Sequence, residues 1–275
     1  MFIENLYLEI TRNCNLECEH CLRGDSKNEY MSSQTIKNIF KDIKGIDRLL
    51  LTGGEPLLAI NQIKEIISII KTNNIKINSI MLITNGTILN KNVIETLKEL
   101  SSISVLHLRL SYDMFHFLEL NRLKLLDIRV KNAKVFKELF NALDYASFDD
   151  TSFSNKKVIM PIGRALKLSS ERLEKINNMS DSKYSLSEYC VEKNPWSSFN
   201  ASYNAFNYVV DGTISIDVNS NVVAYSLPFD DEDAEKLKYN SNINKIGLSR
   251  AILNYIEYYE ELRDNMHKSL GLRLK

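Results

Sequence analysis

Apolar and polar positions along the first 110 residues predict strands and helices in alternation. Short apolar runs typical of buried strands lie at residues 5–10, 48–51, 78–83 and 104–110. Between them, apolar residues recur every three to four positions, which predicts amphipathic helices. These segments run from Ser32 or Ser33 to about Lys44, and over residues 63–70 and 91–100. A chain that alternates strand and helix in this way favours a parallel sheet flanked by helices.

The pattern becomes less regular after residue 116. Residues 117–143 are helical in pattern and rich in basic side chains, and a short apolar run at 157–160 predicts a fifth strand. The basic side chains are Arg122, Lys124, Arg129, Lys131, Lys134 and Lys137. We interpret them as a solvated helix face in preference to a docking surface for phosphate or an acidic peptide.

The last third of the chain reads as a smaller unit. Residues 169–200 are polar and without periodicity, so we place a domain boundary there and divide the chain into 1–168 and 169–275. Asp211-Gly212 lies between two apolar runs and predicts a hairpin turn between strands at 206–210 and 213–217. A strand at 222–225 and a helix at 245–270 complete a small α+β extension.

Three of the four cysteines follow the first predicted strand. Cys14, Cys18 and Cys21 are spaced C-x3-C-x2-C. Three thiolates from one loop can converge on a soft metal centre, and iron–sulfur cubanes normally take four cysteine ligands, so three would leave one iron open. A zinc site is the alternative, although structural zinc needs a fourth ligand. A disulfide framework is not expected in a chain this long with so few cysteines.

The other predicted strands also end in polar or glycine-rich motifs. Gly53-Gly54-Glu55-Pro56 ends the second strand, a Thr-Asn-Gly containing Asn85 ends the third, and Ser111-x-Asp113 ends the fourth. Glycines at a strand end let the backbone approach a ligand closely, and a carboxylate such as Glu55 can accept a charge-assisted hydrogen bond. Parallel α/β folds place their sites at this edge of the sheet.

Together, C-x3-C-x2-C, GGEP, TNG and S-x-D resemble the motifs of the radical S-adenosylmethionine (SAM) superfamily. The resemblance implies a partial (β/α)6 TIM-like barrel over 1–168, a [4Fe–4S] cluster on Cys14, Cys18 and Cys21, and SAM as cosubstrate. It also implies an external electron donor such as flavodoxin or ferredoxin. In this family, reductive cleavage of SAM gives a radical that abstracts hydrogen from an unactivated C–H bond, and the cofactor carries that chemistry.

The resemblance also assigns residues to the cosubstrate. It implies that Gly53, Gly54 and Glu55 lie at the methionine amino group, that Asn85 lies near SAM, and that Ser111 and Asp113 accept from the ribose hydroxyls. Arg164, in a P-x-G-R-A sequence, would meet the SAM carboxylate or a substrate anion, or else form a structural ion pair. His20 would pack near the adenine or be an exposed loop histidine, and His116 reads as a structural histidine.

The segment 169–275 resembles a SPASM or twitch module but lacks its cysteines, so we expect one cluster. Such extensions accompany peptide maturation, which favours a peptide or protein substrate for epimerisation, cross-linking or a related C–H modification. Cys190 is then a candidate hydrogen donor, or a buried small hydrophobe. The alternatives are a nucleotide, tRNA or small-metabolite substrate, and a non-catalytic protein that binds zinc or a partner.

Composition and charge argue against several classes of protein. Of the 275 residues, 35 are basic and 35 acidic, and this balance argues against a dedicated nucleic-acid surface. No apolar run reaches membrane-spanning length, and the first residues lack the pattern of a signal peptide. Few, clustered cysteines fit a reducing compartment, so we expect a cytoplasmic protein without a membrane partner.

Overall fold

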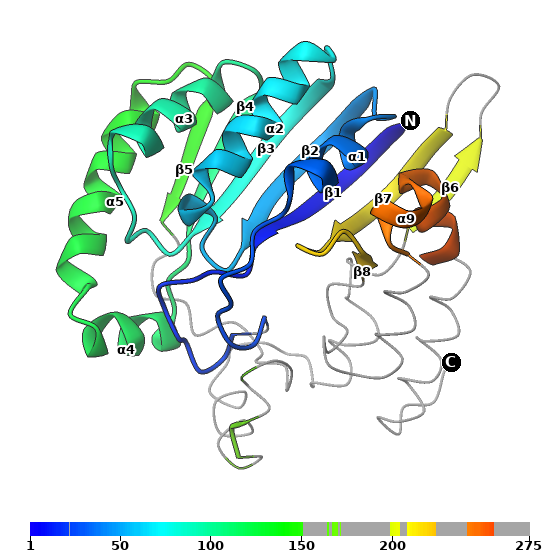
Figure 1. The fold of residues 1–275 in the computed structure, drawn as a ribbon. Coiled ribbons are helices and arrows are strands. Elements are labelled where there is room, and N and C mark those ends of the chain that lie inside the picture. The colour runs from blue at the N-terminus through cyan, green and yellow to red at the C-terminus, as the bar shows by residue number, and fades with distance from the viewer. Residues whose placement is uncertain are drawn as a thin grey trace.

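The described part of the chain forms one eight-stranded, mostly parallel sheet (Figure 1). The structure is a computed structural model. It describes residues 1–21, 23–150, 164, 167–169, 171, 199–203, 208–223 and 241–255. No helix in these ranges is both long and apolar enough to span a membrane.

Six strands of the sheet run parallel, in the order β5-β4-β3-β2-β1-β7. They are β1 (Phe2–Thr11), β2 (Gly45–Gly53), β3 (Lys76–Thr84), β4 (Val105–Leu110), β5 (Ala146–Asp150) and β7 (Tyr208–Ile216). Two short strands, β6 (Phe199–Tyr203) and β8 (Val222–Val223), pair antiparallel with β7. The expected α/β class with a parallel sheet is confirmed.

The apolar core lies between the sheet and the helices on one of its faces. Alternate residues of β1, such as Leu6, Leu8 and Ile10, are fully buried in this core. Figure 1 shows the helices that lie along that side of the sheet. They are α1 (Ser33–Phe40), α2 (Ile60–Thr72), α3 (Lys91–Ser101) and α5 (Leu126–Asn141). The apolar stripe of each helix packs against the sheet, as the alternation of strands and amphipathic helices in the sequence predicts.

The fifth parallel strand is not where the sequence pattern predicted it. Strand β5 pairs with β4, from Leu106 opposite Ala146 to Leu110 opposite Asp150. Its sequence, ASFDD, is polar and half exposed, and therefore lacks the apolar run that signals a buried strand. The predicted strand at 157–160 lies outside the described residues.

The predicted hairpin around Asp211-Gly212 is wrong. Strand β7 continues through both residues, with Gly212 at φ +95°, and pairs in parallel with β1. The hairpin is instead formed by β6 and β7, where Tyr203 pairs with Tyr208. Residues from the predicted extension thus share the barrel's own sheet, and the division into 1–168 and 169–275 stays a prediction.

The predicted helix at 117–143 is two helices. Helix α4 (Met114–Arg122) ends before Lys124, whose φ of +57° is incompatible with helix continuation, and α5 then begins at Leu126. The break separates α4 from α5, and Figure 1 shows α4 near the loop after β1. Toward the C-terminus, α9 (Ile243–Ile246) and helical residues 248–255 fall in or beside the predicted helix at 245–270, the remainder of which lies outside the described residues.

Candidate functional site

The predicted motifs gather at the carboxyl edge of the sheet. Residues 12–30, which we call the cysteine loop, leave β1 at this edge and return to α1. The ends of β2, β3 and β4 supply the glycine pair, the segment around Asn85, and Ser111 with Asp113. Parallel pairing of these strands brings the four motifs side by side, as the strand-end argument predicts.

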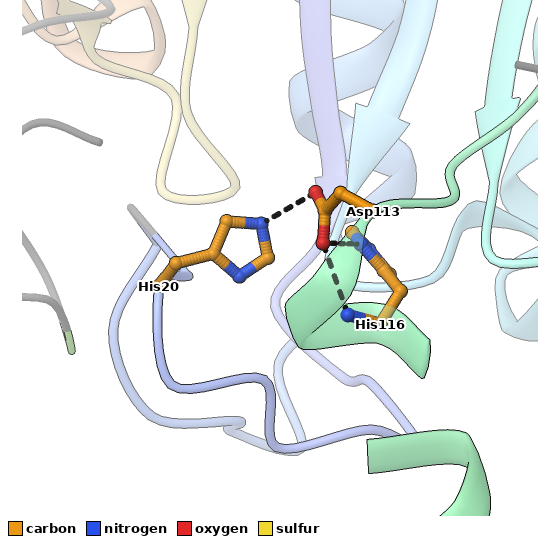
Figure 2. A group of neighbouring side chains, drawn as sticks. All are labelled: His20, Asp113 and His116. Atoms are coloured by element: carbon orange, nitrogen blue, oxygen red, sulfur yellow. Dashed lines mark hydrogen bonds and ion pairs between the residues drawn. The ribbon is translucent and has the colours of Figure 1, made fainter. Parts of the chain in front are cut away.

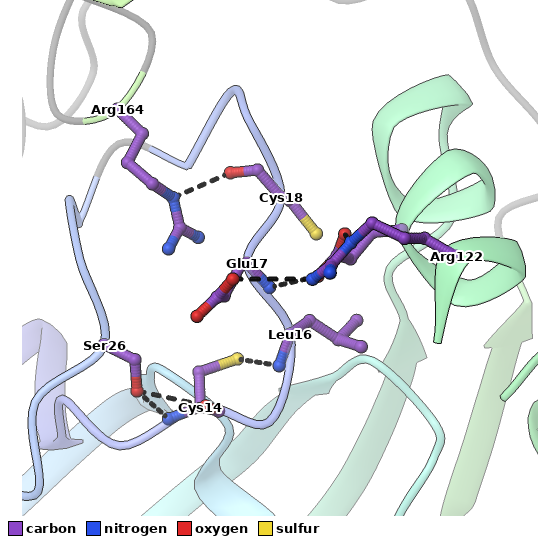
Figure 3. Close-up of polar contacts among 8 residues, drawn as sticks. Cys14, Leu16, Glu17, Cys18, Ser26, Arg122 and Arg164 are labelled. Carbon is purple, nitrogen blue, oxygen red and sulfur yellow. Dashed lines mark hydrogen bonds and ion pairs between the residues drawn. The ribbon is translucent and has the colours of Figure 1, made fainter. Parts of the chain in front are cut away.

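The three cysteines form a partly buried group of free thiols. Cys18 is 5% exposed, and Cys14 and Cys21 are half-buried. The Cys21 backbone N–H donates to the Cys18 carbonyl at 3.1 Å, which folds the loop into a turn between them. The Leu16 backbone N–H donates to Cys14 Sγ at 3.4 Å (Figure 3). Donation of this kind stabilises a sulfur that carries negative charge.

Burial and neighbouring groups raise the pKa of two of the thiols. Burial, followed by smaller effects that include nearby Glu55 and Cys21, raises the pKa of Cys14 to about 12. Burial, and then the proximity of Cys21 and Cys14, raises the pKa of Cys18 further still. Three free thiols on one short loop can bind one metal centre, and a bound cationic metal removes the protons that burial otherwise retains. The residues present therefore fit a cluster with three cysteine ligands.

The two glycines of GGEP lie against the cysteine loop itself. A Cβ on Gly53, which has φ +154°, would lie 2.2 Å from the Thr11 carbonyl oxygen, and one on Gly54 would lie 2.3 Å from the Asn13 carbonyl oxygen. The Gly54 and Glu55 N–H groups donate to those same two oxygens at 2.8 Å. The close approach expected of these glycines is thus made to the base of the loop, and their contact with SAM stays a prediction.

Glu55 is fully buried and links the end of β2 to the end of β3. Its carboxylate accepts from Leu57 N–H at 3.0 Å, from Thr84 Oγ1 at 2.7 Å and from Asn85 N–H at 2.7 Å. Burial raises the pKa of Glu55 to about 7 although these three bonds lower it. Its predicted bond to the SAM amino group would add a fourth donor, which a carboxylate can accept.

Asn85 connects the end of β3 to the cysteine loop. Its Nδ2 donates to Asn15 Oδ1 at 3.0 Å and lies 4.0 Å from Cys14 Sγ. Its Oδ1 accepts from both the N–H and the hydroxyl of Thr87. Asn85 thus lies beside Cys14 and holds a loop residue between Cys14 and Cys18. Its position near SAM stays a prediction.

Asp113 lies between two histidines (Figure 2). Its carboxylate is 3.0 Å from His20 Nε2 and 2.9 Å from His116 Nδ1, and it also caps α4 by accepting from the His116 backbone N–H at 3.0 Å. Burial raises its pKa, but the two histidines outweigh burial and hold the pKa of Asp113 well below its usual range. The carboxylate expected at the ribose is therefore already paired.

The surroundings of His20 contradict one of its two sequence interpretations. Its side chain is 16% exposed and stacks on Phe115 at a centroid distance of 4.7 Å, so it is not an exposed loop histidine. A position near the adenine stays a prediction. Ser111 lies at the end of β4, where its N–H donates to the Thr84 carbonyl at 2.8 Å, and its contact with the ribose also stays a prediction.

Two further residues hold the cysteine loop from outside it (Figure 3). Arg164 Nε donates to the Cys18 carbonyl at 2.9 Å, and its backbone N–H donates to the Cys21 carbonyl at 3.0 Å. Glu119 of α4 accepts from the Glu17 backbone N–H at 2.8 Å. Sequence reasoning predicts Arg164 as a site residue but misses Glu119, because its contact joins residues 102 positions apart and depends on the fold. Cys190 lies outside the described residues.

A buried ion pair joins the same loop to β1. Arg23 Nη1 is 3.0 Å from Glu9 Oε1, and the side chains are 9% and 3% exposed. Glu9 points to the face of β1 opposite Leu8 and Ile10, which pack in the core. An acidic residue between apolar positions of a strand could have indicated a buried polar contact, but its partner depends on the fold of the loop.

Part of the sequence matches a known protein family. The family described as "Radical SAM superfamily" matches residues 8–161. An uncharacterised protein of Methanocaldococcus jannaschii is 34% identical over 102 residues, which are 36% of each chain. GTP 3',8-cyclase of Clostridium botulinum is 29% identical over 194 residues, covering 60% of this chain and 59% of its own. The chain therefore spans less than two thirds of these relatives.

Solved structures show more distant similarity. Streptococcus suis SuiB bound to S-adenosylmethionine is 13% identical with a TM-score of 0.45, over 80% of this chain and 60% of its own. The anSMEcpe structure with bound AdoMet and Cp18Cys peptide is 13% identical with a TM-score of 0.39, over 98% of this chain and 100% of its own.

Proposed function

The chain belongs to the radical SAM superfamily, and from this premise we propose that it abstracts a hydrogen atom from an organic substrate. Enzymes of the superfamily use a [4Fe–4S] cluster and SAM. When bound, this pair supplies a carbon-centred radical able to break an unactivated C–H bond. The transferred hydrogen ends in 5′-deoxyadenosine and leaves an unpaired electron on the substrate carbon.

The observation that carries the proposal is the arrangement of Cys14, Cys18 and Cys21. All three thiols belong to one loop at the carboxyl edge of a parallel sheet, and the loop base is held by backbone bonds from Gly54 and Glu55. In the proposed function these cysteines hold the cluster. Asn85 lies 4.0 Å from Cys14 Sγ, and Ser111 bonds to the neighbouring end of β3 through Thr84. In the proposal these two strand-end residues bind and orient the cosubstrate.

We propose a peptide or protein as the substrate. Support comes from the P-x-G-R-A sequence at residues 161–165 and from the likeness of the C-terminal segment to SPASM and twitch modules. In this proposal the C-terminal segment, which lacks the cysteines that bind additional clusters in those modules, binds the substrate. Cys190 is the candidate donor of a hydrogen atom to the substrate radical, which would make the reaction an epimerisation.

A purine nucleotide is the second candidate, favoured by the names of the relatives. GTP 3',8-cyclase of C. botulinum matches 60% of this chain. Two side chains of the basic segment are already engaged, because Arg122 pairs with Glu119 and Arg129 pairs with Asp150 at 2.6 Å. These ion pairs engage two of the basic side chains that an RNA backbone would contact, and so argue against RNA as the substrate. They do not argue against a small nucleotide, which needs no extended basic surface.

One experiment separates the two substrates. The reconstituted, reduced protein is given SAM together with either GTP or synthetic peptides encoded by short reading frames beside its gene. A peptide substrate predicts 5′-deoxyadenosine formation that rises with peptide, and deuterium transfer from deuterated peptide into 5′-deoxyadenosine. Stimulation and deuterium transfer with GTP alone would replace the peptide proposal with the nucleotide one.

The electron donor is the remaining partner. We propose a small reduced flavodoxin or ferredoxin, because the cluster needs one electron for each hydrogen abstraction. A reduced flavodoxin that supports 5′-deoxyadenosine formation in place of a chemical reductant would support this assignment.

A further inference from the structure

Helix α4 contacts the cysteine loop at two separate points. At its start, the Asp113 carboxylate pairs with His20 at 3.0 Å (Figure 2). Two turns later, Glu119 Oε1 accepts from the Glu17 backbone N–H at 2.8 Å. Glu17 precedes Cys18 and His20 precedes Cys21. Each contact is therefore made to the residue directly before a cysteine.

Glu119 is held in a fixed position by its own helix. Both of its oxygens bond to Arg122, with Nε and Nη2 each at 2.7 Å, and the residue is only 7% exposed. A two-point contact between a guanidinium and a carboxylate fixes the direction of both groups. Arg122 Nη2 also reaches Glu17 Oε2 at 3.4 Å (Figure 3). The acceptor that faces the Glu17 N–H thus cannot rotate freely.

Apolar packing joins the same two elements between the polar contacts. Leu16 and Cys18 of the loop form one buried cluster with Phe115 and Leu120 of α4. Leu120 and Leu16 are essentially inaccessible to solvent, and Cys18 is 5% exposed. Cys18 is therefore packed against α4 while Glu17 and His20 on either side of it are bonded to that helix.

We propose that α4 positions the cysteine loop, with Glu119 and Asp113 as positioning residues that fix the place of Cys18 among the three thiols. Glu119 bonds to the Glu17 backbone N–H, and Asp113 bonds to the His20 imidazole. The value of this positioning for catalysis rests on the proposed function. The positioning itself is a property of the protein without a cluster and can be measured there.

The first test measures how well Cys18 is protected in the cluster-free protein. Native protein is labelled anaerobically with a thiol reagent, and mass spectrometry follows Cys18. Glu119→Ala is expected to raise the Cys18 labelling rate roughly tenfold above that of Glu119→Gln, the change that loss of a hydrogen bond to a charged acceptor produces. Glu119→Gln is the reference because it loses the same charge near Cys18 but keeps an oxygen that can accept from the Glu17 N–H. Asn121→Ala is the matched control on the same helix, because the Asn121 side chain donates to the Phe117 carbonyl of α4 itself.

The second test uses the reconstituted protein. The electron paramagnetic resonance spectrum and the midpoint potential of the cluster are compared among wild type, Glu119→Ala, Glu119→Gln and Asn121→Ala. Glu119→Ala is expected to broaden the spectrum, shift the potential and hasten iron loss to a chelator. Glu119→Gln keeps an oxygen that can accept from Glu17 and is expected to restore wild-type values in large part, whereas a role confined to helix stability would leave the spectrum and potential unchanged.

The outcomes separate this inference from the proposed function. Equal Cys18 labelling in folded Glu119→Ala and Glu119→Gln would overturn the positioning role of α4, whatever the protein does with iron. If Glu119→Ala does not fold, Cys18 labelling in Asp113→Asn provides the test. Asparagine also caps helices well, so the helix is retained, but it cannot keep the charged contact with His20. Cys18 of this variant should label faster than that of wild type, and an equal rate would contradict the proposal.

Discussion

Single residues in the strand-end motifs hold the site together. Gly53 and Gly54 allow the end of β2 to contact the base of the cysteine loop. Glu55 accepts three hydrogen bonds from the ends of neighbouring elements. Motif spacing alone is enough to identify these residues. It cannot reveal that they contact the cysteine loop and β3, because those contacts depend on which strands become neighbours.

Gly53→Ala tests the close approach at the loop base. A Cβ would meet the Thr11 carbonyl at 2.2 Å, and because the obstacle is backbone the loop must move. We expect a loss of roughly 2 kcal/mol or more in the free energy of unfolding, measured by chemical denaturation of the cluster-free protein.

Gly247→Ala is the matched control for Gly53. Its φ of +79° is also unfavourable for alanine, but among the described residues nothing lies within 4 Å of the added Cβ. It should cost about 1 kcal/mol from backbone strain alone. Equal losses in the two variants would mean that contact with the cysteine loop contributes nothing at Gly53.

Glu55 predicts a pH dependence of stability. Its pKa rises from 4.5 to about 7 on folding, so between these values the folded protein keeps a proton that the unfolded chain has lost. The resulting stabilisation is complete below the unfolded pKa and disappears as pH rises through the folded pKa.

Comparison with Glu55→Gln, which cannot titrate there, isolates this effect. From about pH 5 to about pH 8, the unfolding free energy of wild type should fall relative to that of the variant by up to roughly 3 kcal/mol. The measurement is denaturant unfolding of cluster-free protein at each pH. A difference between the two proteins that does not change with pH would show that Glu55 titrates normally.

At the scale of elements, sequence pattern predicts what repeats and misses what is irregular. The helices α2 and α3 follow clear apolar spacing, and the parallel strands β1 to β4 follow apolar runs. Strand β5 is polar and therefore gives no such signal. In β7 the Asp-Gly pair is a strong turn signal that predicts a hairpin, whereas pairing with β1 holds the chain extended through Gly212.

The pairing of β7 with β1 can be tested through Ile214. This residue lies opposite Leu6 and is fully buried in the main core. Ile214→Ala should lower the free energy of unfolding by about 2–5 kcal/mol, because it leaves a cavity in a well-packed region.

Ile246→Ala provides the comparison for Ile214, since Ile246 is 39% exposed and should lose much less. Both are measured by the same denaturation experiment. A small and equal effect at the two positions would contradict the pairing of β7 with β1 inside the sheet.

At the scale of the molecule, the sheet brings residues distant in sequence to one edge. Four residues from separate parts of the chain bond to the cysteine loop: Glu55 after β2, Asn85 after β3, Glu119 in α4, and Arg164. The cysteine spacing alone indicates the centre. The contacts between distant residues, above all the pair of Asp113 with His20, arise only from the assembled fold.

The most direct test of the account is cluster-dependent cleavage of SAM. The protein is purified without oxygen, reconstituted with iron and sulfide, reduced, and given SAM, with Cys14→Ala, Cys18→Ala and Cys21→Ala as controls. We predict about four irons per chain and 5′-deoxyadenosine that is lost in each variant. Bound zinc in place of iron, or an intact cluster that leaves SAM uncleaved, would contradict the account.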